Sequence, residues 1–211
     1  MSPVLLILSA PSGAGKTTIA RRLAVSRPDV DHSVSATTRA PREGERDGVD
    51  YHFVSPEEFT RRVEAGAFLE WAEYGGQRYG TLRREVERLT EAGKHVILDI
   101  EVQGARQVRD RWENVLSVFI IPPSAEALLE RLGGRRTENA ASVRNRLERA
   151  LDELDEASAY DYVIVNDDLE AAVRAVSGIL DGRDPGTPRM TLNEQVARLK
   201  TDLSRELSRD A

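Results

Sequence analysis

Val4-Leu-Leu-Ile-Leu-Ser-Ala-Pro-Ser-Gly-Ala-Gly-Lys-Thr17 is the stretch of sequence that determines how this chain begins to fold. Its apolar start, residues 4–8, is typical of a strand that is buried on both faces of a sheet. A turn with two glycines follows, and Ile19-Ala-Arg-Arg-Leu-Ala24 then has the composition of a helix. The segment therefore predicts a strand, a tight loop and a helix, in that order.

The loop itself has the residues of a phosphate-binding P-loop. In such a loop, backbone N–H groups surround phosphate oxygens, a lysine contacts the terminal phosphates and a Ser or Thr hydroxyl ligates Mg²⁺. Gly13, Gly15, Lys16 and Thr17 occupy those positions. A turn that only joins a strand to a helix does not need a lysine and a threonine there, so we favour phosphate binding. Ala10 stands where the general pattern has glycine, and its methyl group requires a negative φ.

Composition limits the classes of function. The 211-residue chain has no cysteine, which excludes disulfides, thiol catalysis and cysteine-ligated metals and suits a reducing compartment. Its histidines lack metal-ligand spacing. A net charge of −6 argues against general nucleic-acid binding, and no apolar run is long enough for a signal-peptide core or a membrane span. We therefore expect a cytoplasmic protein with neither a nucleic-acid nor a membrane partner.

Strand-like apolar runs alternate with helical segments along the chain. The runs are residues 4–9, 95–100, 115–121 and 161–165. Near-continuous aliphatic and aromatic strands of this kind, separated by helices, are typical of a parallel sheet that helices cover on both faces. We predict a three-layer α/β fold of the P-loop type with a parallel sheet core, forming one domain over about residues 1–184.

A different region lies at about residues 33–80. Its apolar pieces are short, for example Tyr51-His-Phe-Val54 and Ala67-Phe-Leu-Glu-Trp71. We interpret it as a small sheet inserted into the larger fold.

Two helices are marked by their end residues. Ser55-Pro-Glu-Glu58 has an N-cap serine, a first-turn proline and a capping-box glutamate, and Gly66 ends that helix. Thr81 and Gly93 are expected to bracket the second helix in the same way.

Two arginines in the inserted region suggest an anion site. Arg39 and Arg42 flank a proline, and their guanidinium groups could converge on one phosphate. The alternative is an ordinary solvated surface. The phosphate interpretation is favoured because Tyr51, Glu70, Tyr79, Gly80 and Thr81 follow, and phenol hydroxyls and a Thr hydroxyl are groups that a small phosphate site would use.

A second group of arginines lies near residues 132–150. From residue 135 to residue 149 there are five arginines against two glutamates. A helix face with charge pairs, such as Arg144 with Glu148, is one explanation. Phosphoryl transfer, however, requires cations that close over the migrating group. We therefore predict a mobile lid over about residues 132–150.

With these groups in view, the chain resembles the guanylate kinases of bacteria over about residues 3–182. The resemblance rests on segments that occur in the family's order and spacing: Ser9-Ala-Pro-Ser-Gly-Ala-Gly-Lys-Thr17, Ser35-Ala-Thr-Thr-Arg-Ala-Pro-Arg-Glu-Gly-Glu45, Asp50-Tyr-His-Phe-Val54, Phe68-Leu-Glu-Trp71, Tyr79-Gly80, Ile97-Leu-Asp-Ile100, Gln103-Gly104, Ile121-Pro-Pro-Ser124 and Val165-Asn-Asp-Asp168. It implies transfer of the γ-phosphate of ATP to GMP or dGMP, giving ADP and the nucleoside diphosphate, in purine nucleotide recycling and GTP supply.

The resemblance also implies a role for each site residue. An ATP site would comprise Ala10, Pro11, Ser12, Gly13, Ala14, Gly15, Lys16, Thr17, Thr18, Arg135 and Asn166. A GMP site would comprise Ser35, Arg39, Arg42, Tyr51, Glu70, Tyr79, Gly80, Thr81 and Asp99, with Ser35, Glu70 and Thr81 at the guanine base. Lys16, Arg39, Arg135 and Arg146 would be catalytic, and Thr17 and Asp99 would hold Mg²⁺.

The sequence departs from the family at a few positions. Thr81 replaces a frequent serine and keeps its hydroxyl, and Glu101 replaces a frequent aspartate and keeps its charge. Arg136 stands where glycine is frequent, which leaves open whether Arg135 or Arg136 contacts phosphate.

Two other functions were weighed. A non-catalytic protein-binding module of the same fold would be expected to lack Lys16 or the loop glycines, and this chain has both. A kinase for another nucleoside monophosphate is disfavoured by Glu70 together with Ser35.

The C-terminal part, residues 185–211, is predicted to be a linker and a helix. Apolar residues recur there at helical spacing over about residues 190–208, at Leu192, Val196, Leu199, Leu203 and Leu207. This stripe must be covered, either by the rest of the chain or by the same helix of a second copy in a homodimer.

Overall fold

The computed structural model describes residues 2–133, 140–183 and 189–209. Its elements fall into two compact units, which we describe separately. The first unit contains Met1–Ile7 and Ala24–Leu116, and the second contains Leu8–Leu23 and Ser117–Ala211.

The main sheet is parallel where its register is defined, and its strand order is β2-β7-β1-β8-β9. Its strands are β1 (Leu5–Ser9), β2 (Val30–His32), β7 (His95–Asp99), β8 (Val115–Ile121) and β9 (Tyr162–Val165). Every residue of β1 is buried, as the continuous apolar run predicted. The α/β fold with a parallel sheet core and the four predicted strands are confirmed. The sequence analysis missed β2, because only its first residue is buried and the strand has three residues.

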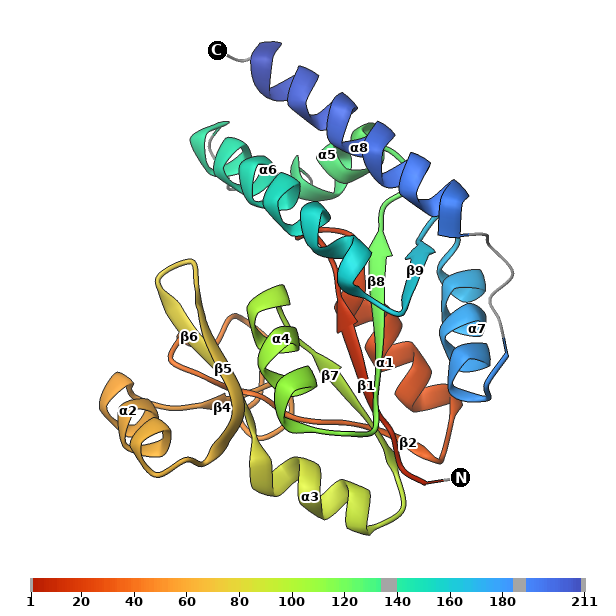
Figure 1. Ribbon diagram of the computed structural model, residues 1–211. Helices are drawn as coiled ribbons and strands as arrows, with labels where there is room; N and C mark the ends of the chain where they lie inside the picture. The colour runs from red at the N-terminus through yellow and green to blue at the C-terminus, as the bar shows by residue number, and fades with distance from the viewer. Residues whose placement is uncertain (1, 134–139, 184–188, 210–211) are drawn as a thin grey trace. The chain divides into compact units, whose positions relative to one another are not determined.

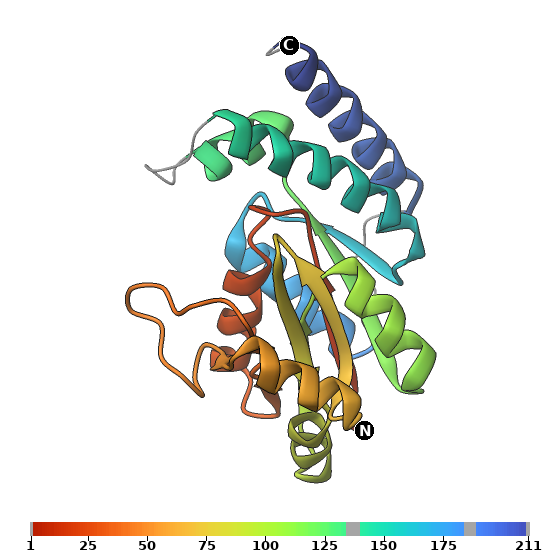
Figure 2. The same ribbon diagram turned by 90° about the vertical axis from the view of Figure 1, so that its left-hand side faces the viewer.

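A second, smaller sheet belongs to the first unit. Its order is β4-β3-β6-β5, formed by β4 (His52–Phe53), β3 (Ala36–Thr37), β6 (Gln77–Leu82) and β5 (Phe68–Tyr74). Helix α2 (Pro56–Glu64) buries Phe59 against Phe68, with ring centroids 4.5 Å apart. Helix α4 (Val102–Arg111) packs on β5, and Figure 2 shows it beside the β5–β6 hairpin. The small sheet lies in the region where the sequence predicted short strands.

The predicted helix ends are partly correct. The Ser55 hydroxyl accepts a hydrogen bond from the Glu58 N–H at 3.1 Å and so caps α2. The Glu58 carboxylate was expected to complete the capping box. In the structure it accepts a hydrogen bond from Arg62 Nε at 2.7 Å, on the surface of the helix. Helix α3 (Arg83–Glu91) has Leu82 as its N-cap, with no side-chain capping bond, and the Thr81 hydroxyl donates to Glu70 instead.

The remaining helices belong mainly to the second unit. They are α1 (Lys16–Ser26), α5 (Ala125–Gly133), α6 (Ala140–Asp155), the short 3₁₀ helix η1 (Glu156–Ala159), α7 (Leu169–Leu180) and α8 (Arg189–Arg209). Helix α8 packs on α6, α5 and β9, and Figure 1 shows it running along the α5–α6 pair. Leu199 and Leu203 of the predicted stripe are buried, so the chain itself covers this part of α8.

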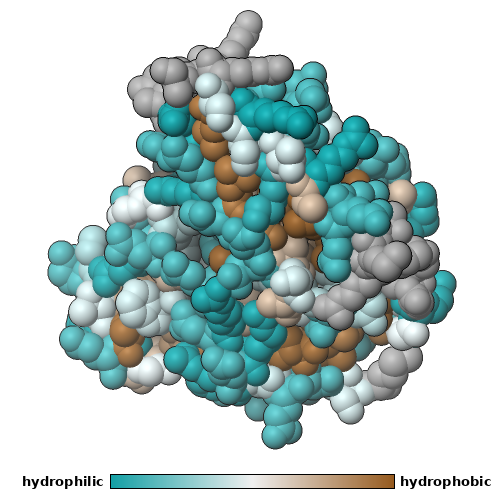
Figure 3. Space-filling model, turned by 45° about the horizontal axis from the view of Figure 1, so that its top comes forward, coloured by the Kyte–Doolittle hydropathy of each residue, from teal (hydrophilic) through white to brown (hydrophobic). Residues whose placement is uncertain are grey.

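Hydrophilic side chains dominate the face drawn in Figure 3, and apolar side chains appear on it in narrow runs. Within residues 2–133, 140–183 and 189–209, no helix has the length and apolar character needed to cross a membrane.

Candidate functional site

The loop between β1 and α1 has the backbone geometry expected of a P-loop. Gly13 and Gly15 have φ angles of 91° and 94°, a region that residues with a Cβ rarely adopt. A Cβ added to Gly13 would lie 3.0 Å from Leu132 Cδ2, so the loop also packs closely on α5. Positive φ occurs only at glycines among the described residues, and Ala10 therefore has the negative φ that its methyl group requires.

Asn166, which follows β9, supports this loop from the side. Its Nδ2 donates a hydrogen bond to the Ala14 carbonyl at 2.7 Å. A Cβ added to Gly15 would lie only 2.3 Å from the same Nδ2 atom, so a larger residue would displace the amide. Arg131 Nη2 in turn donates to the Asn166 carbonyl at 3.1 Å. The contact that the structure shows for the Asn166 side chain is with the loop, and its contact with adenine remains a prediction.

Helix α6 contributes one arginine to the same place. Arg146 Nη2 donates a hydrogen bond to Ser12 Oγ at 3.0 Å. Lys16 is half-buried, and Thr17 and Thr18 are exposed in the first turn of α1. The structure thus brings together Arg146, Asn166 and the predicted ATP-site residues 10–18. Arg135 and Arg136 lie outside the described residues, and the lid at about 132–150 therefore stays a prediction.

A buried carboxylate is the central feature of the first unit. Glu70 is 4% exposed, and its Oε1 accepts hydrogen bonds from the Thr81 N–H at 2.9 Å and the Thr81 hydroxyl at 2.6 Å. The register of β5 against β6 shifts between Phe68 and Glu70. Such an irregularity commonly redirects a side chain at a functional site.

Gly104 of α4 lies directly behind this carboxylate. A Cβ at position 104 would be 2.3 Å from Glu70 Oε2, which is closer than real Cβ contacts. Glycine at this position therefore leaves room for Glu70 to keep its present position.

The two arginines of the inserted region are held differently from each other. Arg39 Nη2 donates to Glu45 Oε1 at 2.9 Å, and its guanidinium lies 5.4 Å from the centre of the Tyr51 ring. Glu45 Oε2 accepts the Arg42 backbone N–H at 2.7 Å, while the Arg42 side chain is exposed. The hydrogen bond between the Arg39 guanidinium and the Glu45 carboxylate raises the pKa of Arg39 and lowers the pKa of Glu45. The structure shows Glu45 between these residues, and convergence of both guanidinium groups on a phosphate remains a prediction.

The other predicted GMP-site residues lie on neighbouring elements of the first unit. The rings of Tyr51 and Tyr79 meet edge to face at 6.1 Å. Ser35 precedes β3, and its carbonyl accepts the His52 N–H at 2.9 Å. Gly80 is buried in β6, and Asp99 is the last residue of β7 and is half-buried.

Sequence reasoning assigned no role to Glu45 or Gly104. Both residues lie inside motifs that the sequence analysis quoted, but an acidic surface residue and a helical glycine have no chemistry that marks them in a sequence. Their importance follows only from contacts with Arg39 and Glu70.

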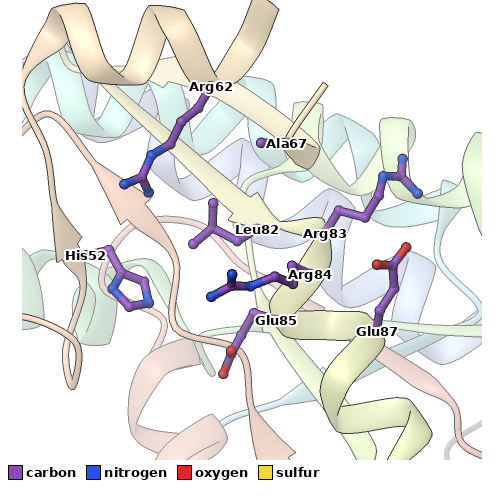
Figure 4. Close-up of a pocket in the computed structure, with 8 residues that line it drawn as sticks. All are labelled: His52, Arg62, Ala67, Leu82, Arg83, Arg84, Glu85 and Glu87. Carbon is purple, nitrogen blue, oxygen red and sulfur yellow. The ribbon is translucent and has the colours of Figure 1, made fainter. Parts of the chain in front are cut away.

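The first unit also has a pocket of about 530 Å³ whose lining residues come from β4, α2 and the junction of β6 with α3 (Figure 4). It is lined by His52, Arg62, Ala67, Leu82, Arg83, Arg84, Glu85 and Glu87, and includes none of the predicted site residues. Successive strand residues face opposite sides of a sheet, so His52 and Leu82 lie on the other face from Tyr51 and Thr81. This pocket is therefore distinct from the Glu70 cluster.

The two clusters differ in chemistry. In the second unit, the glycine-rich loop, Lys16 and Arg146 offer backbone N–H groups and cations, which are suited to a polyphosphate. In the first unit, Glu70 is an anionic acceptor suited to a ligand with neighbouring N–H donors, and Arg39 with the tyrosines is suited to a phosphate.

Comparison with known proteins gives one consistent result. The guanylate kinase family profile matches residues 2–183. A guanylate kinase of Anaeromyxobacter dehalogenans is 51% identical over 84% of this chain and 79% of its own length, and one of Symbiobacterium thermophilum is 49% identical over 88% of each. The crystal structure of guanylate kinase from Anaplasma phagocytophilum matches with a TM-score of 0.72 and 40% identity, covering 86% of each chain. The chain belongs to the guanylate kinase family.

Proposed function

We propose that this chain transfers the γ-phosphate of ATP to GMP or dGMP, with the Glu70 cluster as the acceptor site and the P-loop as the donor site. The observation that carries this proposal is the buried Glu70 carboxylate, held by Thr81 and backed by Gly104. Family membership supports the same reaction.

The acceptor base is recognised by Glu70 in this proposal. Guanine presents its N1–H and its 2-amino group side by side as donors, and an ionised carboxylate accepts roughly four hydrogen bonds. In this proposal the Glu70 carboxylate, which already accepts two bonds from Thr81, also accepts both guanine donors. Adenine has an N1 lone pair in that position, which would face the carboxylate. Ser35 completes the proposed base site at the start of β3.

The acceptor phosphate binds at Arg39, Arg42, Tyr51 and Tyr79 in this proposal. Glu45 accepts hydrogen bonds from the Arg39 side chain and from the Arg42 backbone in the structure. We propose that the GMP phosphate, which is also an anion with several acceptor oxygens, takes over part of this bonding when it binds.

The donor triphosphate is held by residues 10–18, with Lys16 neutralising charge on its terminal phosphates. Arg146 donates a hydrogen bond to Ser12 of the loop, and we propose that it contacts the nucleotide phosphates. Asn166 fixes the shape of the loop through Ala14, and we propose that it borders the adenine side of the site.

Mg²⁺ fits the available donor chemistry. Thr17 is an exposed residue with a hydroxyl in the first turn of α1, and Asp99 offers carboxylate oxygens at the end of β7. Mg²⁺ prefers oxygen ligands and is usually bound by one or two protein groups together with substrate phosphates. When bound, the ion neutralises phosphate charge. We propose Thr17 and Asp99 as its protein ligands.

The reaction needs no general base from the protein. An oxygen of the GMP phosphate, already ionised at neutral pH, forms a bond to the γ-phosphorus as the bond to the β-phosphate oxygen breaks and ADP leaves. Catalysis then consists of holding the two nucleotides in line and neutralising charge. Lys16, Arg39, Arg135 and Arg146 supply that charge in the proposal.

Two finer points belong to the same proposal. Because the sequence contains no cysteine and suits a reducing compartment, we place the reaction in the cytoplasm. A homodimer through α8 would have to use its exposed residues, since Leu199 and Leu203 are already covered by their own chain.

Base selectivity tests the assignment of Glu70. We expect GMP to be used at least about 10² times better than AMP, because adenine places a lone pair where guanine offers the buried carboxylate two donors. We also expect Glu70→Gln to raise the KM for GMP more than the KM for ATP. A coupled assay with ATP and each of GMP, dGMP, AMP, CMP and UMP measures both effects. Equal turnover of AMP and GMP would show that the assignment is wrong.

Gly104→Ala tests whether the space behind Glu70 matters. The added methyl group must push the carboxylate away from its position, and we expect GMP to bind about 10-fold more weakly, the loss of one or more hydrogen bonds to a charged group. Calorimetric titration with GMP measures this change. Gly178→Ala is the matched control, because Gly178 is also helical and an added Cβ there meets only ordinary contacts, at 3.8 Å or more. Equal affinities in the two variants would contradict this role for Gly104.

Lys16→Ala tests the donor site. We expect the transfer rate to fall about 10³-fold, as is usual when a group that neutralises phosphate charge is removed. The circular dichroism spectrum should be unchanged, since a half-buried lysine at the first position of α1 contributes little to packing. Arg84→Ala removes an exposed cation elsewhere and should retain full activity. A Lys16→Ala protein with near-normal turnover would refute the donor site.

A further inference from the structure

Helix α8 makes polar contacts with α6 near both ends of α6. Lys200 Nζ forms an ion pair with Asp155, the last residue of α6. Near the other end, Arg144 Nη1 donates a hydrogen bond to the Leu207 carbonyl of α8 at 3.3 Å. Leu199 and Leu203 are buried on α8, which packs on α6, α5 and β9. Both the apolar and the polar contacts therefore connect α6 with α8.

Arg144 donates to α8 at the C-terminal end of that helix, where backbone carbonyls lack a hydrogen-bond donor within the helix. The last carbonyls of a helix have no partner within the helix and carry partial negative charge. Leu207 lies in the last turn of α8, which ends at Arg209. Arg144 Nε also donates to Glu148 Oε1 at 3.2 Å, which holds the guanidinium along the surface of α6. One side chain thus joins α6 to the C-terminal end of α8.

Arg144 and Arg146 face different sides of α6. At 3.6 residues per turn, side chains two positions apart lie about 200° apart around a helix. Arg144 accordingly contacts α8, whereas Arg146 contacts Ser12 of the P-loop. Helix α6 thus lies between the C-terminal helix and the loop.

We propose that Arg144 is a positioning residue for the donor site, because its bond to α8 holds α6 in the orientation in which Arg146 reaches the P-loop. This inference rests on the proposed role of the loop and Arg146 in binding ATP. It gives the C-terminal helix a function in nucleotide binding, although none of its own residues contacts the nucleotide.

The test compares Arg144→Ala with Arg198→Ala. Arg198 is 86% exposed on α8 and lies 3.9 Å from Asp202 of its own helix, so it is a control for loss of an arginine. Calorimetric titration with an ATP analogue that has a β,γ-imido bridge, and separately with GMP, measures the two sites. We expect Arg144→Ala to weaken analogue binding about 5-fold and to change GMP binding less than 2-fold, as for loss of one positioning contact. Arg198→Ala should change neither.

The same titration in an Arg146→Ala background shows how Arg144 acts. If Arg144 acts through Arg146, the double variant binds the analogue no more weakly than Arg146→Ala alone. Additive losses would overturn the proposal. A lower melting temperature of Arg144→Ala with unchanged analogue affinity would also overturn it, since the contact would then be structural only.

Two further variants keep the result interpretable. Arg144→Lys replaces Arg144→Ala in the test if the alanine variant does not fold. The lysine retains a donor for the Leu207 carbonyl, and we expect an intermediate loss of analogue affinity. Arg146→Ala alone tests the proposed donor site. If it leaves analogue affinity unchanged, the role of Arg146 is wrong, a failure distinct from that of the link to α8.

Discussion

The buried carboxylate of Glu70 is the constraint on which the acceptor site depends. An ionised group taken out of water is costly unless hydrogen bonds replace its hydration. Thr81 supplies two such bonds from a single residue, through its backbone N–H and its hydroxyl. The register shift in β5 brings Glu70 opposite Thr81, and the missing side chain of Gly104 leaves space behind it. The small sheet and α4 together thus maintain one anion in a defined place.

The donor loop follows a related principle, with backbone geometry in place of a side chain. Two glycines with positive φ shape the loop, and Asn166 holds it through the Ala14 carbonyl. The close approach of Asn166 to Gly15 explains why a residue with a side chain does not fit there. A loop that is already shaped for phosphate loses less conformational entropy when the nucleotide binds.

The sequence was sufficient to predict the elements whose signal is local. Four buried strands, the capped start of α2 and the P-loop all follow from residue type and spacing. Strand β2 was missed because three residues with one buried side chain have no periodicity. Thr81 was expected to mark the start of a helix, but its side chain is used by Glu70, a residue eleven positions away in another strand. Glu45 and Gly104 matter only through contacts that depend on the tertiary structure.

The proposed pairing of Glu70 with two donors of guanine is the central claim of this account. Inosine monophosphate tests it most directly, because it keeps the N1–H of GMP and lacks only the 2-amino group. Steady-state kinetics with saturating ATP should give a kcat/KM for inosine monophosphate about 10- to 100-fold below that for GMP, the value of one hydrogen bond to a buried charge. Equal values for the two nucleotides would show that the carboxylate does not bind the 2-amino group, and would contradict the account.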